Sequence, residues 1–158
     1  VTYSISSSIG LIARSPRTSD QVLIPPAVKE EISVGQVLGV DLPDLETLDW
    51  ITVQRPISEA ARPLVVNLGP GETQVLMLAL EISEAIVVLD DALARDMAIA
   101  LNLHLTGTLG LLLDAKQAGL ISKVSPLLDK LQALRLRLAD HTRIAVLKLA
   151  GEEDAGDA

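Results

Sequence analysis

The sequence contains no cysteine and no phenylalanine, and its only aromatic residues are Tyr3 and Trp50. Without cysteine the chain forms no disulfide bond or thiolate zinc site, and it has no thiol nucleophile. Two aromatic residues are too few to stack a series of bases, which disfavours single-strand readers of that kind. With only two histidines besides, a metal site in this chain would have to be built from carboxylates.

Long apolar runs are also absent, although 49% of the 158 residues are hydrophobic. No stretch approaches the roughly 18 apolar residues of a membrane-spanning helix, so we expect no membrane segment. The opening VTYSISSSIG lacks the features of a secretory signal, which favours a cytoplasmic protein of prokaryotic type. The length fits a single domain, which we place at residues 1–150, and the polar residues 151–158 predict an acidic, disordered tail.

The charge is unevenly distributed along the chain. Acidic residues outnumber basic ones by 21 to 13, giving a net charge of −8 that opposes binding of nucleic acid through charge alone. Six acids and no base lie between Glu30 and Asp49, whereas seven of the thirteen bases follow position 110. An acidic and a basic region can therefore coexist on one surface.

Apolar patterns alternate between strand-like and helix-like segments. Short apolar runs predict strands at residues 22–24, 50–54, 85–89 and 103–105. One helix is expected to begin at Pro26, a second to span residues 72–82, and a third to begin after Asp91. A fourth is expected to end at Gly119, and a final pair is expected near residues 124–134 and 144–149. The 72–82 helix is apolar at nearly every position and is expected to be buried. This alternation predicts an α/β domain with a largely parallel sheet and helices on both faces.

Two acidic residues follow the predicted strand at 85–89 directly. Ligands bind beyond the carboxyl ends of parallel strands, so Asp90 and Asp91 are candidates to hold Mg²⁺ or Mn²⁺. The alternative is that Asp91 caps the next helix, with Arg95 forming an ion pair with it one turn later. Glu72 begins a helix after Gly69-Pro70-Gly71, where it is either a dipole partner or a functional acid. This glycine segment lacks the motif of a nucleotide loop, so nucleotide binding is discounted.

Together these segments resemble a known family. The strings VLIPPAVKEEI, LGPGETQVLMLALE, VVLDDALARDMAIALNLHLTGTLGLLLDAKQAGLI and VSPLLDKL are similar to prokaryotic PIN-like proteins related to the VapC-type toxins, over about residues 22–150. The resemblance implies a three-layer PIN-like fold with a mostly parallel central sheet flanked by helices. It also implies a ribonuclease that holds Mg²⁺ or Mn²⁺ with acids, an antitoxin-like partner that blocks the cleft, and a homodimer.

Residues of the family site can be transferred to this sequence. The resemblance assigns catalysis to Asp90, Glu31 and Glu72 and metal binding to Asp90, Asp91 and Glu31. Substrate contacts fall to a separate group, namely Thr106, Thr108, Arg95, Arg135 and Arg137. One position departs from the family: Ser7 stands where the first metal-binding aspartate is expected, so residues 1–21 are a degenerate or shortened version of the family's first strand and helix. A neutral serine lowers the expected metal affinity.

Two functions therefore remain open. The first is a metal-dependent ribonuclease, the toxin of a toxin–antitoxin pair, that hydrolyses RNA phosphodiesters. The second is a catalytically impaired PIN-like module that binds RNA or a protein, because the first metal-binding aspartate is missing.

Overall fold

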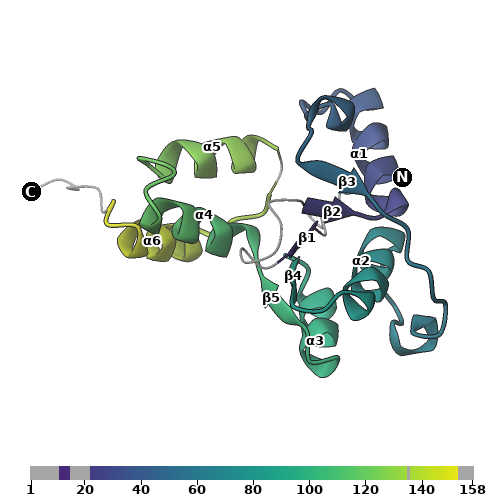
Figure 1. Cartoon of the computed structure of the whole chain (residues 1–158). Coiled ribbons are helices and arrows are strands. Elements are labelled where there is room, and N and C mark those ends of the chain that lie inside the picture. Colours follow the sequence, from purple (N-terminus) through teal and green to yellow (C-terminus); the bar gives the residue numbers. More distant parts are fainter. Residues whose placement is uncertain (1–10, 15–21, 135, 153–158) are drawn as a thin grey trace, which may run out of the picture. The chain divides into compact units, whose positions relative to one another are not determined.

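The computed structural model describes residues 11–14, 22–134 and 136–152, which form two compact units divided between Thr106 and Gly107 (Figure 1). The first unit contains β1 (Leu11–Arg14), β2 (Val22–Ile24), α1 (Pro26–Val37), η1 (Leu45–Thr47), β3 (Ile51–Val53), η2 (Arg62–Leu64), α2 (Pro70–Glu81), β4 (Ala85–Val88), α3 (Ala92–Ala100) and β5 (His104–Thr106). The second contains α4 (Thr108–Gln117), α5 (Ser125–Ala133) and α6 (Asp140–Leu149). The sequence predicts a single domain at residues 1–150, and this remains a prediction because the division into two compact units does not test it.

One five-stranded sheet, in the order β3-β2-β1-β4-β5, forms the centre of the first unit. The β2/β3 and β4/β5 pairs are parallel, while β1 is antiparallel to both of its neighbours, β2 and β4. Strands β2, β3, β4 and β5 therefore run in one direction and β1 runs against them. The predicted α/β class and mostly parallel sheet are confirmed, with β1 as the exception.

The core of the first unit is aliphatic, as the composition requires. Helix α2 supplies its centre, because five consecutive side chains from Val75 to Ala79 are no more than 1% exposed. This confirms the expected burial of the helix on most of its sides. Helix α2 packs on α1, β1 and β4, and α3 packs on β5. Burial of these side chains is the main stabilising contribution to the unit and fixes the starts of α1 and α2 relative to the sheet.

The starts and ends of the helices follow local chemistry. Pro26 and Pro70 occupy the first turns of α1 and α2, where the missing N–H removes no helical hydrogen bond. Gly119 follows α4 with a φ of +73°, a left-handed conformation that glycine adopts without steric cost. These ends lie where the sequence predicts them, within a few residues.

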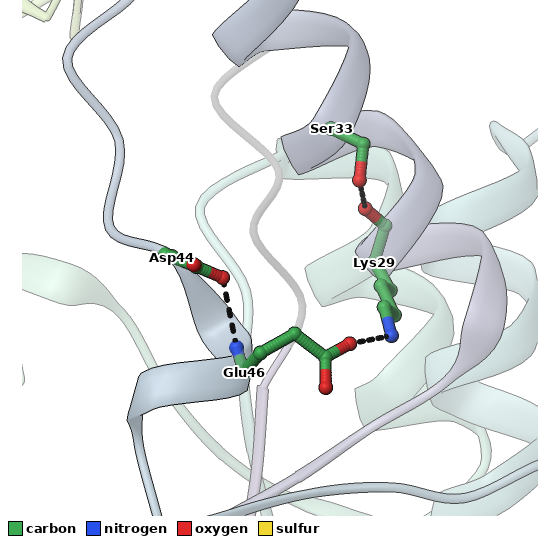
Figure 2. A network of polar contacts seen from close by, with 4 residues as sticks. All are labelled: Lys29, Ser33, Asp44 and Glu46. Atoms are coloured by element: carbon green, nitrogen blue, oxygen red, sulfur yellow. Dashed lines mark hydrogen bonds and ion pairs between the residues drawn. The ribbon is translucent and has the colours of Figure 1, made fainter.

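The chain after α1 is bound back onto that helix (Figure 2). Lys29 of α1 forms an ion pair with Glu46 of η1, and the Glu46 backbone N–H donates to Asp44 Oδ1 at 3.0 Å. Ser33 Oγ donates to the Lys29 carbonyl at 2.9 Å. Lys29 is the basic residue closest in sequence to Glu31, and it is thus paired with the carboxylate of Glu46.

The second unit has its own small core of Val124, Leu128 and Val146. Its last described residue, Glu152, accepts hydrogen bonds from the backbone N–H groups of Val124 at 2.6 Å and Ser125 at 3.0 Å, and lies 3.2 Å from Lys116 Nζ. The disordered tail expected at residues 151–158 stays a prediction, although amides at the start of α5 bind the carboxylate of its second residue, Glu152. Residues 153–158 lie outside the described part.

Within the described ranges, no helix has the length and hydropathy needed to cross a bilayer.

Candidate functional site

An acidic cavity lies in the first unit, where α1, α2 and the start of α3 come together. Its volume is about 590 Å³. The acidic side chains that line it are Glu30, Glu31, Glu72 and Asp91, and the apolar ones include Val34, Leu38, Leu68 and Leu93. No lysine, arginine or histidine belongs to this lining, as far as the structure describes it. Such a cavity repels the phosphates of a nucleic acid unless a cation is bound in it.

Glu31 on α1 reaches the first turn of α2. Its Oε1 accepts a hydrogen bond from the backbone N–H of Gly71 at 3.0 Å, although the two residues lie 40 positions apart in the sequence. The N–H of Gly71 is one of the amides that a helix start leaves without a helical partner. This bond, together with the packing of α1 on α2, brings Glu31 beside Glu72.

Glu72, in the first turn of α2, is the only buried charged residue in the described chain, with 7% of its surface exposed. No described residue forms a hydrogen bond or ion pair with its side chain. Leaving a charged group buried and without a partner is costly, so an external cation would gain binding energy at this point.

The pKa of Glu31 is raised above its usual value near 4.5. Partial burial of its carboxyl is the largest cause, and the negative charge of Glu72 is the second. The Gly71 hydrogen bond acts in the opposite direction, and Glu30 adds a smaller increase. The raised pKa of Glu31 thus reflects its partial burial and the nearby negative charge, and no base is among its causes.

Asp90 and Asp91 follow β4 as predicted, at the carboxyl end of that strand. Asp91 is the N-cap of α3, and its Oδ1 accepts from the Ala94 N–H at 2.8 Å. The expected Asp91–Arg95 ion pair is wrong: the Arg95 guanidinium donates to the carbonyl of Leu89 at 2.8 Å instead. That carbonyl lies at the end of a strand and needs a donor, so it binds the arginine while Asp91 faces the helix start.

The remaining predicted site residues are dispersed along the chain. Thr106 ends β5, the parallel neighbour of β4, and Thr108 is the first residue of α4 in the second unit. Arg137 is exposed in the second unit, between α5 and α6. Ser7 and Arg135 lie outside the described residues. The structure therefore brings Glu31, Glu72 and Asp91 to one cavity, and none of the other candidates that it describes belongs to the cavity lining.

Sequence reasoning missed two glycines of this site. The sequence around Gly69 and Gly71 suggests only a phosphate loop, whereas Gly71 binds the Glu31 carboxylate and Gly69 lies against that of Glu72. The signal was present in the sequence, as two glycines flanking Pro70 immediately before a helix with an early glutamate.

Comparison with protein families gives a match over nearly the whole chain. The family model DUF3368, described as a PIN domain, matches residues 6–152, nearly the whole chain. The chain belongs to the PIN domain family. A search of curated proteins and a search of solved structures gave no match. The PIN-like fold expected from the resemblance is thereby confirmed, and with it a nuclease-type architecture.

PIN domains typically use divalent metals, and two residues of this PIN domain fit such an ion. The buried Glu72 has no partner among the described residues, and Glu31 beside it supplies a second carboxylate. No group of three or more acids or histidines in the described ranges is arranged to hold a metal. Mg²⁺ commonly retains several waters and binds through one or two carboxylates plus substrate phosphates, which is compatible with a pair.

Proposed function

We propose that this PIN domain protein is a ribonuclease that hydrolyses RNA phosphodiesters with Mg²⁺ or Mn²⁺ held by Glu31 and Glu72. The observation that carries the proposal is the pair itself. Two carboxylates lie side by side, one of them is buried with no partner in the part of the chain that the structure describes, and the cavity around them is lined by acids and by no described base. A structural pair of acids would be expected to have a basic partner, because like charges repel.

Each residue of the site has a defined task in this proposal. When bound by these carboxylates, a divalent ion would supply positive charge to polarise a phosphate and activate water. Glu72 binds the ion from the first turn of α2, while Glu31 binds it from α1 and is anchored by the Gly71 amide. The raised pKa of Glu31 means that ion and proton compete for the same carboxylate. Apolar side chains such as Val34 and Leu93 line the rest of the cavity.

Asp90 is the third proposed carboxylate, because it lies two residues after the end of β4 and next to Asp91 of the cavity. Asp91 already caps α3 with one oxygen, and we propose that it adds negative charge to the site in a secondary role. Arg95, Thr106, Thr108, Arg135 and Arg137 are proposed contacts to RNA phosphates and sugars.

A toxin role follows from the resemblance to VapC-type proteins, with an antitoxin-like protein as inhibitor and a homodimer as the active form. Growth arrest on expression, relieved by the product of a neighbouring gene, would support it. Growth that is unaffected by the active enzyme would contradict it.

A second candidate function is a binding module without catalysis. It is favoured by the observation that described acids and histidines form no group of three that could hold a metal. In that case the protein would bind RNA or a protein partner without cleaving it.

The deciding experiment measures cleavage of a fluorescently labelled RNA by purified protein in Mn²⁺ and in EDTA. Glu72→Gln keeps the size of the side chain and removes its charge, and should lower the rate by about 100-fold or more. Glu84→Gln is the matched control, since Glu84 is exposed and lies outside the acidic cavity. If both variants cleave like the unmodified protein, or if none cleaves, the ribonuclease proposal is wrong; RNA binding without cleavage supports the second function.

A further inference from the structure

Gly69 and Gly71 occupy backbone conformations that do not require glycine. Gly69, the N-cap of α2, has φ −65° and ψ 165°, an extended conformation open to any residue. Gly71 lies in the first turn of the helix and has no positive φ. Alanine is preferred over glycine within a helix, so backbone geometry alone would favour alanine at position 71. Another reason must account for the two glycines.

Carboxylate oxygens fill the space where side chains would begin. A Cβ atom on Gly71 would lie 2.7 Å from both carboxylate oxygens of Glu31 and 3.0 Å from its Cδ. A Cβ atom on Gly69 would lie 2.5 Å from Glu72 Oε2. Cβ atoms essentially never lie within 3.0 Å of such an atom, so either substitution would force the neighbouring carboxylate to move.

We propose that Gly69 and Gly71 are positioning residues for the acidic pair: their missing side chains leave the space in which the carboxylates of Glu72 and Glu31 lie next to each other. Gly71 also holds Glu31 through its backbone N–H at 3.0 Å. The inference rests on the proposed function, because the pair acts as the metal site there, but its geometric content does not depend on catalysis.

The two substitutions should affect folding and metal binding differently. Glu31 keeps access to solvent, so a methyl group at position 71 can displace its carboxylate at little cost to the fold. Gly71→Ala should therefore leave the melting temperature unchanged or raise it, because alanine favours the helix. Loss of a group that orients a metal ligand typically lowers metal affinity by about 10- to 100-fold, and we expect that loss here.

The test is a double-mutant cycle with Mn²⁺ titrated by calorimetry into unmodified protein, Gly71→Ala, Glu31→Ala and the double variant. Gly71→Ala should raise the Mn²⁺ dissociation constant by about 10- to 100-fold. In the Glu31→Ala background the same substitution should have no further effect, because no carboxylate remains to be displaced. Equal Mn²⁺ affinities for unmodified protein and Gly71→Ala would overturn the inference, as would a loss that persists without Glu31.

A second readout needs no metal and separates this inference from the proposed function. The amide proton of residue 71 is followed by NMR in EDTA. Glu31→Ala should shift this proton when residue 71 is glycine, because the hydrogen bond is lost, and should leave it unchanged when residue 71 is alanine. An equal shift in both backgrounds would show that the carboxylate still reaches the amide, and the inference would be wrong even for an inactive protein.

Gly69→Ala provides an independent variant if Gly71→Ala does not fold. It should weaken Mn²⁺ binding in the presence of Glu72 and have no effect on a Glu72→Ala background. Unchanged Mn²⁺ affinity in Gly69→Ala would contradict the role assigned to Gly69.

Discussion

Asp91 is both a helix cap and an acid of the cavity, and substitution can separate the two roles. Its Oδ1 accepts from the Ala94 N–H at 2.8 Å at the start of a nine-residue helix. Asp91→Ala removes this acceptor and the negative charge near the helix start. Loss of an N-cap costs about 1 kcal/mol and loss of the favourable charge about 0.5 kcal/mol, so we expect roughly 1.5 kcal/mol in total.

This loss of free energy should lower the melting temperature by a measurable amount. For a protein of this size each kcal/mol lowers the melting temperature by roughly 2–4 °C, so Asp91→Ala should melt about 3–6 °C lower. Asp91→Asn keeps the acceptor and loses only the charge, and should melt within about 2 °C of the unmodified protein. Trp50, the only tryptophan, lies in the same unit as α3, so its fluorescence follows the unfolding of that unit in EDTA.

The asparagine variant decides the result. If Asp91→Asn is as unstable as Asp91→Ala, the hydrogen bond is not the source of the stability and the capping argument is refuted. The same variant tested with Mn²⁺ should keep most of its affinity, whereas Glu72→Gln should lose it. Equal loss in both variants would make Asp91 a metal ligand.

Two further predictions concern carboxylates with shifted pKa values. Because the pKa of Glu31 is raised, the folded, metal-free protein binds the proton of this carboxyl group more tightly than the unfolded chain does. The free energy of unfolding should therefore fall as pH rises from about 4.5 through the raised pKa. Urea unfolding in EDTA should show a smaller fall for Glu31→Gln, and an identical pH slope would contradict this origin. The pKa of Glu152 is lowered, first by its hydrogen bond from Val124, so its contribution should be lost as pH falls through that lowered value. Glu152→Ala should speed hydrogen exchange of the Val124 and Ser125 amides, and unchanged exchange would show that these bonds do not form in solution.

Local structure was predictable because its causes lie within a few residues of the chain. Pro26 and Pro70 indicate helix starts through their fixed φ, and Gly119 indicates a helix end, whatever the rest of the protein does. The apolar run around Val87 predicts a strand in the same way. The direction of β1 was not predictable, because strand pairing depends on contacts between segments far apart in the sequence.

The same distinction between local and long-range causes applies to the candidate site. The sequence by itself determined that a metal site would use carboxylates, since it contains no cysteine, and it indicated Glu31, Glu72 and Asp90 through the family resemblance. Only the tertiary structure decided which acids meet. The Glu31–Gly71 hydrogen bond spans 40 residues and exists because α1 packs on α2, and Arg95 binds the Leu89 carbonyl because the strand ends beside it. Spacing along one chain cannot encode such contacts, since they depend on how separate elements pack.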